Sequence, residues 1–262
     1  MNAAPFIPAL AIEHVSVHFG GLVAIADMSF TVNEGELVSL IGPNGAGKTT
    51  AFNVVTGFLA PTHGEIRYRG VSLRGLKSHE VANLGLVRTF QKTSVFAANT
   101  VFDNVLIGLH RHGASSVWGT LLALPGVRRE EQRLRDEARE ILDFVGLSAR
   151  ETELGGALPY GEQRLLEVAI ALAARPTLLL LDEPVSGMNA SETASFIALI
   201  AKIRGRGVTV LLVEHDMHLV MNVSDRIVVL NYGRIIAEGA PAEIQGNPEV
   251  VRAYLGQGVK RA

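Results

Sequence analysis

The sequence predicts an α/β fold built around a mostly parallel β-sheet, with an antiparallel β part near the N-terminus and an inserted helical part. Three observations lead to this fold class. A short apolar run, residues 36–41, precedes a glycine-rich loop and a predicted helix, Lys48–Val55. Beyond Pro159, apolar strands alternate with helical segments, which is typical of parallel sheets covered by helices. Between these parts, residues 100–146 show a helical pattern.

The N-terminal part reads as short strands separated by turns. The apolar runs Leu10–Phe19 and 28–32 flank Gly20-Gly21, and we expect them to pair as antiparallel strands. A further strand pair is expected at 65–69 and 71–73.

The middle third predicts an inserted helical subdomain. Val101, Val105 and Leu109 are four residues apart and share one helix face. Residues 128–146 form a charged amphipathic pattern, whose apolar stripe is Leu134, Ala138, Ile141, Leu142 and Val145.

The last third alternates helices and strands, and a turn at 231–234 predicts a terminal hairpin. In order, we expect helix 161–174, strand 177–181, helix 191–204, strand 208–213, strand 227–230 and strand 235–238.

Composition limits the class of protein. The net charge of −2 gives no support to a nucleic-acid partner, and 48% apolar with 19% charged residues indicates a globular chain. The absence of cysteine excludes disulfides, cysteine-ligated zinc and thiol nucleophiles, and it suits a reducing cytosol. The first ten residues do not resemble a signal peptide, and no apolar run approaches the roughly 18 residues of a membrane span, so we expect a soluble protein.

The glycine-rich loop matches G-x-x-x-x-G-K-[ST], the phosphate-binding loop of a P-loop NTPase core. Its glycines let backbone N–H groups face a phosphate chain, and the following helix adds positive potential. We therefore predict ATP binding, with Lys48 on the β- and γ-phosphates and Thr49 on Mg²⁺. A chance glycine-rich turn is the alternative, and the strand and helix around the loop argue against it. The expected nucleotide-binding residues here are Gly42, Pro43, Asn44, Gly45, Ala46, Gly47, Lys48, Thr49 and Thr50.

Two carboxylates end the apolar run 178–181. Asp182 is expected to hold Mg²⁺, and Glu183 to polarise the attacking water as general base. Solvated acids at a strand end are the alternative.

Two further polar residues also follow strand-like runs. His215 follows 208–213, at the edge where ligands bind in such sheets, and could donate a hydrogen bond to the γ-phosphate. Gln91 ends the run 85–90, and its carbonyl oxygen could contact Mg²⁺ or water. The alternatives are an isolated surface histidine and a glutamine without a special role.

From about residue 10 to 256, the order of these elements resembles the nucleotide-binding subunits of ABC transporters (ABC ATPases). Leu158-Pro159-Tyr160-Gly161-Glu162-Gln163 lies where that family has its Leu-Ser-Gly-Gly-Gln signature, and Ser186-Gly187-Met188-Asn189 resembles its D-loop. The resemblance implies that Phe19 stacks on adenine. It further implies that two subunits pair head to tail and that each signature caps the other subunit's ATP, here through Tyr160, Gly161 and Glu162. We accordingly expect one domain at 8–256, an inserted helical subdomain at 92–160 and a tail at 257–262.

The chain departs from the family pattern at four positions. Pro159 replaces the signature serine and offers neither a hydroxyl nor an N–H, and Tyr160 replaces the first signature glycine. Ile170 stands where many relatives have arginine, and Asn189 where the D-loop often has aspartate. We infer a weaker composite site at this signature, which suits an asymmetric heterodimer.

Further segments resemble the larger ATPase subunit of branched-chain amino-acid importers. They are Arg88-Thr89-Phe90-Gln91, the signature ending in Gln163-Arg164, Glu214-His215-Asp216-Met217 and the tail 247–256. The resemblance implies membrane permeases and a smaller homologous ATPase as partners, an external solute-binding protein as an indirect one, and a peripheral position on the cytoplasmic face of the inner membrane. Importers of urea or amides, lipopolysaccharide exporters, small-molecule kinases and soluble ABC machines of repair or translation are the alternatives.

The apolar insertion at 108–127, which includes Trp118, is either a contact for membrane subunits or a satellite core under a long loop. Val95, Phe96 and Val101 are better placed to receive a coupling helix of a permease.

Overall fold

The computed structural model describes residues 7–89, 95–109 and 125–255, and the chain divides into two compact units. The first unit comprises Met1–Arg88, Thr177–Glu183 and Ile200–Ala262. The second comprises Thr89–Pro176 and Pro184–Leu199.

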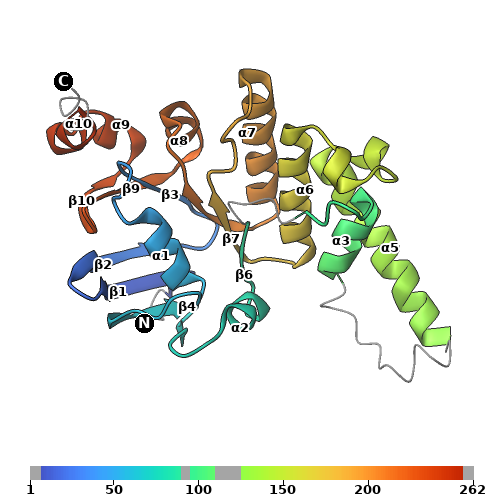
Figure 1. Ribbon diagram of the computed structural model, residues 1–262, viewed down its shortest axis with the longest axis horizontal. Coiled ribbons are helices and arrows are strands. Elements are labelled where there is room, and N and C mark those ends of the chain that lie inside the picture. Colours follow the sequence, from blue (N-terminus) through green and yellow to red (C-terminus); the bar gives the residue numbers. More distant parts are fainter. Residues whose placement is uncertain (1–6, 90–94, 110–124, 256–262) are drawn as a thin grey trace, which may run out of the picture. The chain divides into compact units, whose positions relative to one another are not determined.

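A six-stranded sheet forms the centre of the first unit, in the order β10-β9-β3-β8-β7-β6 (Figure 1). The pairs β9/β3, β3/β8, β8/β7 and β7/β6 are parallel, and only the pair β10/β9 is antiparallel, which confirms the mostly parallel sheet. The strands are β3 (Leu37–Ile41), β6 (Leu86–Arg88), β7 (Leu178–Asp182), β8 (Thr209–Val213), β9 (Arg226–Asn231) and β10 (Arg234–Gly239).

The second sheet of this unit is antiparallel, in the order β2-β1-β4-β5, as the N-terminal pattern predicted. Its strands are β1 (Leu10–Phe19), β2 (Leu22–Val32), β4 (His63–Tyr68) and β5 (Val71–Ser72). The prediction that the second strand starts at Met28 was wrong. Because the turn at Gly20-Gly21 is tight, Phe19 pairs directly with Leu22, and pairing with β1 keeps the chain extended from there.

Helix α1 (Lys48–Val55) packs between the two sheets, and Phe52, Val54 and Val55 join a core shared with β1, β2, β4 and the inner face of the parallel sheet. Strand residues alternate between the faces of that sheet. Val228 and Leu230 face this core, and Ile227 and Val229 face a second one.

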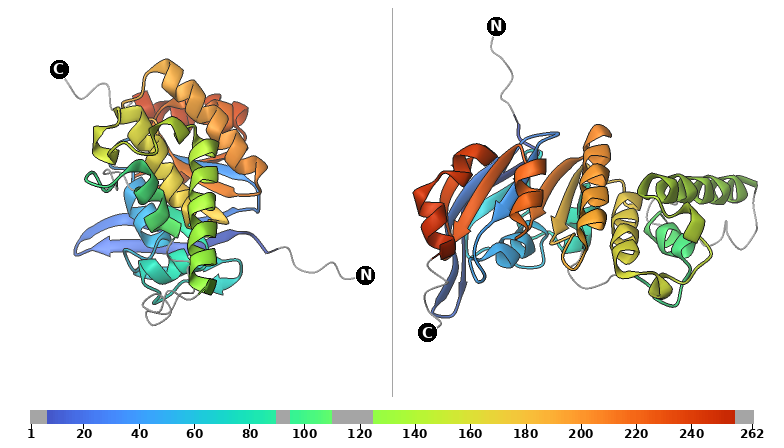
Figure 2. Two further views of the ribbon diagram at one scale, coloured as in Figure 1. Left: turned by 90° about the vertical axis from the view of Figure 1, so that its right-hand side faces the viewer. Right: turned by 90° about the horizontal axis from the view of Figure 1, so that it is seen from above.

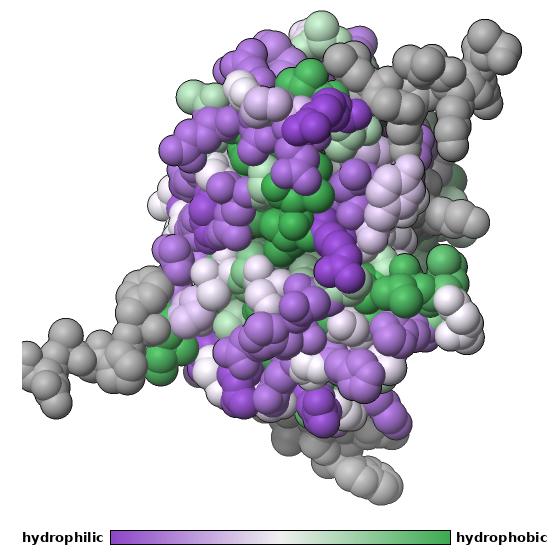
Figure 3. Space-filling view, turned by 90° about the vertical axis from the view of Figure 1, so that its left-hand side faces the viewer, coloured by the Kyte–Doolittle hydropathy of each residue, from purple (hydrophilic) through white to green (hydrophobic). Residues whose placement is uncertain are grey.

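The second core lies under α8 (Met217–Val223), α9 (Pro241–Gln245) and α10 (Pro248–Leu255). On the face where α9 and α10 lie, a band of hydrophobic residues runs among hydrophilic ones (Figure 3). A hollow of about 610 Å³ there is lined by residues of α8, α9 and α10. The first unit also contains α2 (Ser78–Asn83) and the end of α7 (Ala190–Gly205), from Ile200 on.

The second unit is helical, and α3, α5 and α6 lie side by side (Figure 2). Val101, Val105 and Leu109 of α3 are fully buried, and Gly108 lets α3 approach α6, because a Cβ there would lie 2.8 Å from that of Ala173. The elements are α3 (Val101–Leu109), α5 (Pro125–Val145), the 3₁₀ turns Ser148–Arg150 and Gly155–Ala157, α6 (Tyr160–Ala173) and the first part of α7 (Ala190–Gly205).

The expected apolar stripe of α5 is buried throughout, from Leu134 to Val145. The second unit extends past the predicted insertion at 92–160, because α6 and the start of α7 pack within it. None of the described helices combines the length and the apolar character that crossing a bilayer requires.

Candidate functional site

The loop between β3 and α1 requires its glycines. Gly42 has φ 154° and Gly47 has φ 107°, and a Cβ on Gly42 would lie 2.0 Å from the backbone oxygen of Leu230. A Cβ on Gly47 would lie 2.8 Å from the oxygen of Ala24. The backbone therefore passes closely between β2 and β9, with Gly47 directly preceding the first residue of α1.

Lys48 extends over this loop as a partly desolvated cation. Its side chain donates from Nζ to the backbone oxygens of Gly42 (2.6 Å) and Pro43 (3.1 Å). Burial lowers the pKa of Lys48, and the carboxylates of Glu183 and Asp182 act against that shift. The ammonium group of Lys48 has three N–H donors, and two of them bond the loop carbonyls. Phosphate oxygens of a bound nucleotide could take the place of these carbonyls as acceptors.

Two acids stand at the end of β7, the neighbour of β8 in the sheet: Asp182 is its last residue and Glu183 follows it. Asp182 is buried, whereas the side chain of Glu183 is 27% exposed. Glu183 has φ 47°, an unusual value for a residue with a side chain, and its N–H donates to Val213 (2.8 Å). Such strained positions concentrate at functional sites.

His215 lies beside Glu183. Its Nδ1 is 3.8 Å from Oε1 of Glu183 and 3.7 Å from Oε2 of Glu214, and its side chain is mostly exposed. The two residues follow β7 and β8, which are adjacent and parallel, so both reach the same sheet edge. The structure thus brings the predicted base and the predicted histidine together.

The residues present suit a divalent cation bound together with a nucleotide. Within the described ranges no group of three or more histidine or acidic side chains is arranged to hold a metal by itself. Thr49, which is exposed at the start of α1, and Asp182 supply oxygen atoms, the ligands that Mg²⁺ prefers along with phosphates. Asn44 and Gly45 are exposed and Thr50 is half-buried.

The aromatic residue expected at the base lies at the end of β1. Phe19 is 49% exposed in the hairpin turn, where Leu22 and Val23 are also exposed. A half-exposed aromatic face is available for stacking there.

The segment 158–163 starts α6 in the second unit. Pro159 is the residue before the helix, and no side chain caps the helix start there. The Tyr160 ring contacts Gly187, where an added Cβ would lie 3.0 Å from it, and the Tyr160 hydroxyl accepts hydrogen bonds from Arg164 (2.6 and 3.0 Å). Gly161 faces Glu192 in the same way.

Asn189 caps α7. Its Oδ1 accepts from the amides of Ser191 (2.9 Å) and Glu192 (3.0 Å), and Glu192 accepts in return from the Asn189 amide (2.8 Å). Asparagine and aspartate are about equally favoured at this position of a helix.

Comparison with known proteins decides the family. Residues 25–186 match the ABC transporter family, and residues 234–260 match the branched-chain amino acid ATP-binding cassette transporter family. The chain is 45% identical over 251 residues to the high-affinity branched-chain amino acid transport ATP-binding protein BraF of Pseudomonas aeruginosa, covering 95% of this chain and 98% of that protein. It is 43% identical, with the same coverage, to the corresponding protein LivG of Escherichia coli. The chain is an ABC transporter ATP-binding protein.

Solved structures agree. The crystal structure of the ADP conformation of an ATP-binding cassette of an ABC transporter superposes with a TM-score of 0.83, at 31% identity, covering 95% of this chain and 98% of that one. A nucleotide-free cassette gives 0.82, at 31% identity over 94% and 98% of the two chains. The predicted fold class and family of this cassette are confirmed.

The roles assigned to single residues stay predictions. Gln91 and Trp118 lie outside the described residues, as do most of the insertion at 108–127 and the tail 257–262. Lys48, Asp182, Glu183 and His215 come together in the first unit of the cassette.

Sequence reasoning missed one partner of this site. Arg88 donates from Nη2 to Oδ2 of Asp182 (2.6 Å), and both side chains are buried. The sequence shows only that Arg88 lies near the end of one strand-like run and that Asp182 ends another; the structure makes the two strands neighbours.

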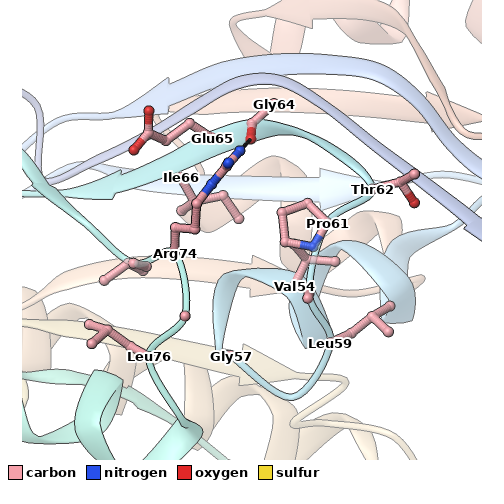
Figure 4. Close-up of a pocket in the computed structure, with 13 residues that line it drawn as sticks. Val54, Gly57, Leu59, Pro61, Thr62, Gly64, Glu65, Ile66, Arg74 and Leu76 are labelled. Atoms are coloured by element: carbon pink, nitrogen blue, oxygen red, sulfur yellow. Dashed lines mark hydrogen bonds between the residues drawn. The ribbon is translucent and has the colours of Figure 1, made fainter.

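A separate hollow of about 360 Å³ lies between the end of α1 and the β4–β5 hairpin (Figure 4). Arg74 extends along it and donates to the backbone oxygen of Gly64 (2.9 Å). Its lining is mainly apolar and carries one carboxylate, Glu65. It therefore lacks the paired groups that hydrolysis requires.

Proposed function

We propose that this cassette is the ATP-hydrolysing subunit of an importer of branched-chain amino acids. The observation that carries the proposal is the gathering of Lys48, Asp182, Glu183 and His215 at one edge of the parallel sheet. The substrate class comes from the similarity to transport proteins whose names state it, and from the matching C-terminal segment.

The geometry supports in-line hydrolysis of the γ-phosphate. Bound Mg²⁺, held by Thr49 and Asp182, would supply neutralisation of phosphate charge. Lys48 leaves the loop carbonyls and donates to the phosphate oxygens. Glu183 polarises the water and takes its proton as the new O–P bond forms and the bond to the β-phosphate oxygen breaks. His215, beside Glu183, donates to an oxygen of the transferred phosphoryl group.

The signature segment of this chain serves a second ATPase subunit in the proposal. The uncapped start of α6 offers backbone amides to a phosphate. Pro159 withholds the hydroxyl and the N–H that a serine would add. A heterodimer with a smaller homologous ATPase fits this asymmetry.

Permeases are the proposed membrane partners. They would hold the chain peripherally on the cytoplasmic face of the membrane. An external solute-binding protein is the proposed indirect partner. Phe96 is half-exposed next to Asn104, whose buried side chain bonds the Phe96 backbone at N (2.8 Å) and O (3.1 Å). An exposed aromatic on a fixed backbone is a suitable contact for a coupling helix.

The test uses membranes that contain the chain together with the permeases and the second ATPase encoded by neighbouring genes. ATP-driven leucine uptake is expected, and Phe96→Asp should abolish co-purification with the permeases while ATP binding is unchanged. Leu154→Asp, at another exposed apolar residue of the second unit, is the matched control. Uptake of urea or amides instead of leucine would reject branched-chain amino acids as the substrate class. Loss of ATP binding in Phe96→Asp would reject the role of Phe96 in coupling.

A further inference from the structure

Arg88 occupies a position between α1 and the end of β7. Its guanidinium donates from Nη1 to Oδ1 of Asn53 (2.7 Å) and from Nη2 to Oδ2 of Asp182 (2.6 Å). The Arg88 Cζ atom lies 5.4 Å from the ring centre of Phe52, within the range of a cation–π contact. Three elements, β6, α1 and β7, therefore meet on one charged side chain.

Because the Arg88–Asp182 ion pair is buried, breaking it costs more free energy than breaking an exposed pair. The side chain of Arg88 is 8% exposed and that of Asp182 is 2% exposed. A buried carboxylate that loses its partner charge is strongly disfavoured, whereas exposed pairs contribute little. The chain carries a clear contrast in Arg175–Glu137, whose side chains are 43% and 25% exposed.

We propose that Arg88 is a positioning residue that competes with Mg²⁺ for Asp182. The inference rests on the proposed function, in which Asp182 contributes to binding Mg²⁺. A guanidinium on Oδ2 stabilises the carboxylate and fixes its orientation, and its positive charge repels a dication that approaches the same group.

The guanidinium of Arg88 is not held at all three of its nitrogens. Nε of Arg88 is buried and makes no hydrogen bond to the described residues. The guanidinium is therefore held through Nη1 and Nη2 and not through Nε. The Nη1 bond to Asn53 can keep the group in place while the Nη2 bond to Asp182 lengthens. Arg88 thereby links occupation of the metal position to β6 and α1.

The proposal gives a definite sign for the Mg²⁺ dependence of nucleotide binding. In Arg88→Met, the competing charge is absent, so the Mg²⁺ concentration for half-maximal binding of a fluorescent ATP analogue falls about ten-fold. Without Mg²⁺, the same variant binds the anionic analogue more weakly than the unaltered protein does. Arg88→Lys keeps the charge and should return the midpoint close to its original value.

The matched control is Arg226→Met, in the same unit. Arg226 is partly buried and pairs with Glu36 and Glu238, at β9, so it shares the chemistry of Arg88 but not its carboxylate. Thermal unfolding adds a second readout, in which Mg²⁺ together with the ATP analogue raises the Tm of Arg88→Met at a lower Mg²⁺ concentration than it raises that of the unaltered protein. Should Arg88→Met fail to fold, Arg88→Gln keeps a polar contact to Asn53 and carries the same expectation.

An unchanged Mg²⁺ midpoint in Arg88→Met would overturn the proposal, as would an equal shift in Arg226→Met. Failure of the unaltered chain to bind the analogue at any Mg²⁺ concentration would instead reject the proposed function. The two failures are therefore distinct.

Discussion

At the scale of single residues, Glu183 combines the features expected of a general base. The residue has an unusual backbone conformation, φ 47°, and its partly exposed carboxylate lies 3.8 Å from His215. It also lies close enough to Lys48 to oppose the burial that lowers the pKa of the lysine. A carboxylate that water can reach, beside two groups able to bind phosphate oxygens, can accept a proton during hydrolysis.

Glu183→Gln should leave ATP bound but unhydrolysed. The amide keeps the size of the side chain and loses the proton acceptor, so we expect phosphate release to fall about 10²- to 10⁴-fold. Equilibrium ATP binding should change little. Phosphate release by the assembled transporter measures the effect, and Glu131→Gln, on the exposed face of α5, is the control. Normal turnover in Glu183→Gln would refute the assignment of the base.

Much of this site could be predicted from the sequence, because its residues lie in short local patterns. The loop 42–49 and the acids at 182–183 each follow an apolar strand, and parallel strands end at one edge. The pairing of Arg88 with Asp182 could not be predicted in the same way. It depends on the register of β6 against β7, in which Arg88 pairs with Leu180 and its side chain reaches the end of β7.

At the scale of elements, α10 reaches back to the phosphate-binding loop. Tyr254 packs on the core that contains Ile41, the last residue of β3. Burial raises the pKa of Tyr254, and the backbone of Gly42 acts against this shift. The C-terminal helix therefore supports the strand from which the loop departs.

Tyr254→Phe should change how stability depends on alkaline pH. Because the folded-state pKa lies above the ordinary value of 10.0, Tyr254 contributes stability that is complete below pH 10 and is lost as the pH rises through the folded-state value. The unfolding free energy of Tyr254→Phe should therefore decline less steeply above pH 10. Urea unfolding at several pH values measures this, with Tyr232→Phe, at an exposed tyrosine, as control. Equal slopes in the original chain and Tyr254→Phe would contradict the prediction.

The helices that the sequence analysis did not predict are short and depend on their ends. Helix α8 is capped by Asp216, whose Oδ1 accepts from the amide of Leu219 (3.0 Å). Helices α9 and α10 begin at Pro241 and Pro248, a favoured residue at a first helical position. Their periodicity covers too few turns to be detected, whereas α5 and α6 were long enough. Helix α1 is as short as α10, and it was expected from the glycine-rich loop that precedes it.

At the scale of the whole molecule, the proposed function assigns one half-site to each of the two units of the cassette. The first unit holds Lys48 and Glu183, and the second holds the signature segment with Pro159. A fold class can be predicted from one chain, because strand and helix patterns are local. The completeness of a composite site cannot, because the partner's residues are not in this sequence.

The chain alone should hydrolyse ATP slowly. A homodimer would cap both nucleotides with Pro159 signatures, and loss of a single phosphate-facing donor lowers turnover roughly a hundred-fold. Pro159→Ser, which adds a hydroxyl and an N–H, should raise the rate, and Pro159→Ala separates the contribution of the N–H. Phosphate release at increasing protein concentration measures this. Robust hydrolysis by the unaltered chain alone would contradict the asymmetry.

Equilibrium binding of Mg·ATP to the purified chain tests the central claim most directly, by comparing the original protein with Lys48→Met. Removal of one charge-assisted contact should weaken binding about 10- to 100-fold, while Lys202→Met, at an exposed lysine of α7, should leave it unchanged. Equal affinities in the original chain and Lys48→Met, or no binding by the original chain, would contradict ATP binding through the loop at residues 42–49.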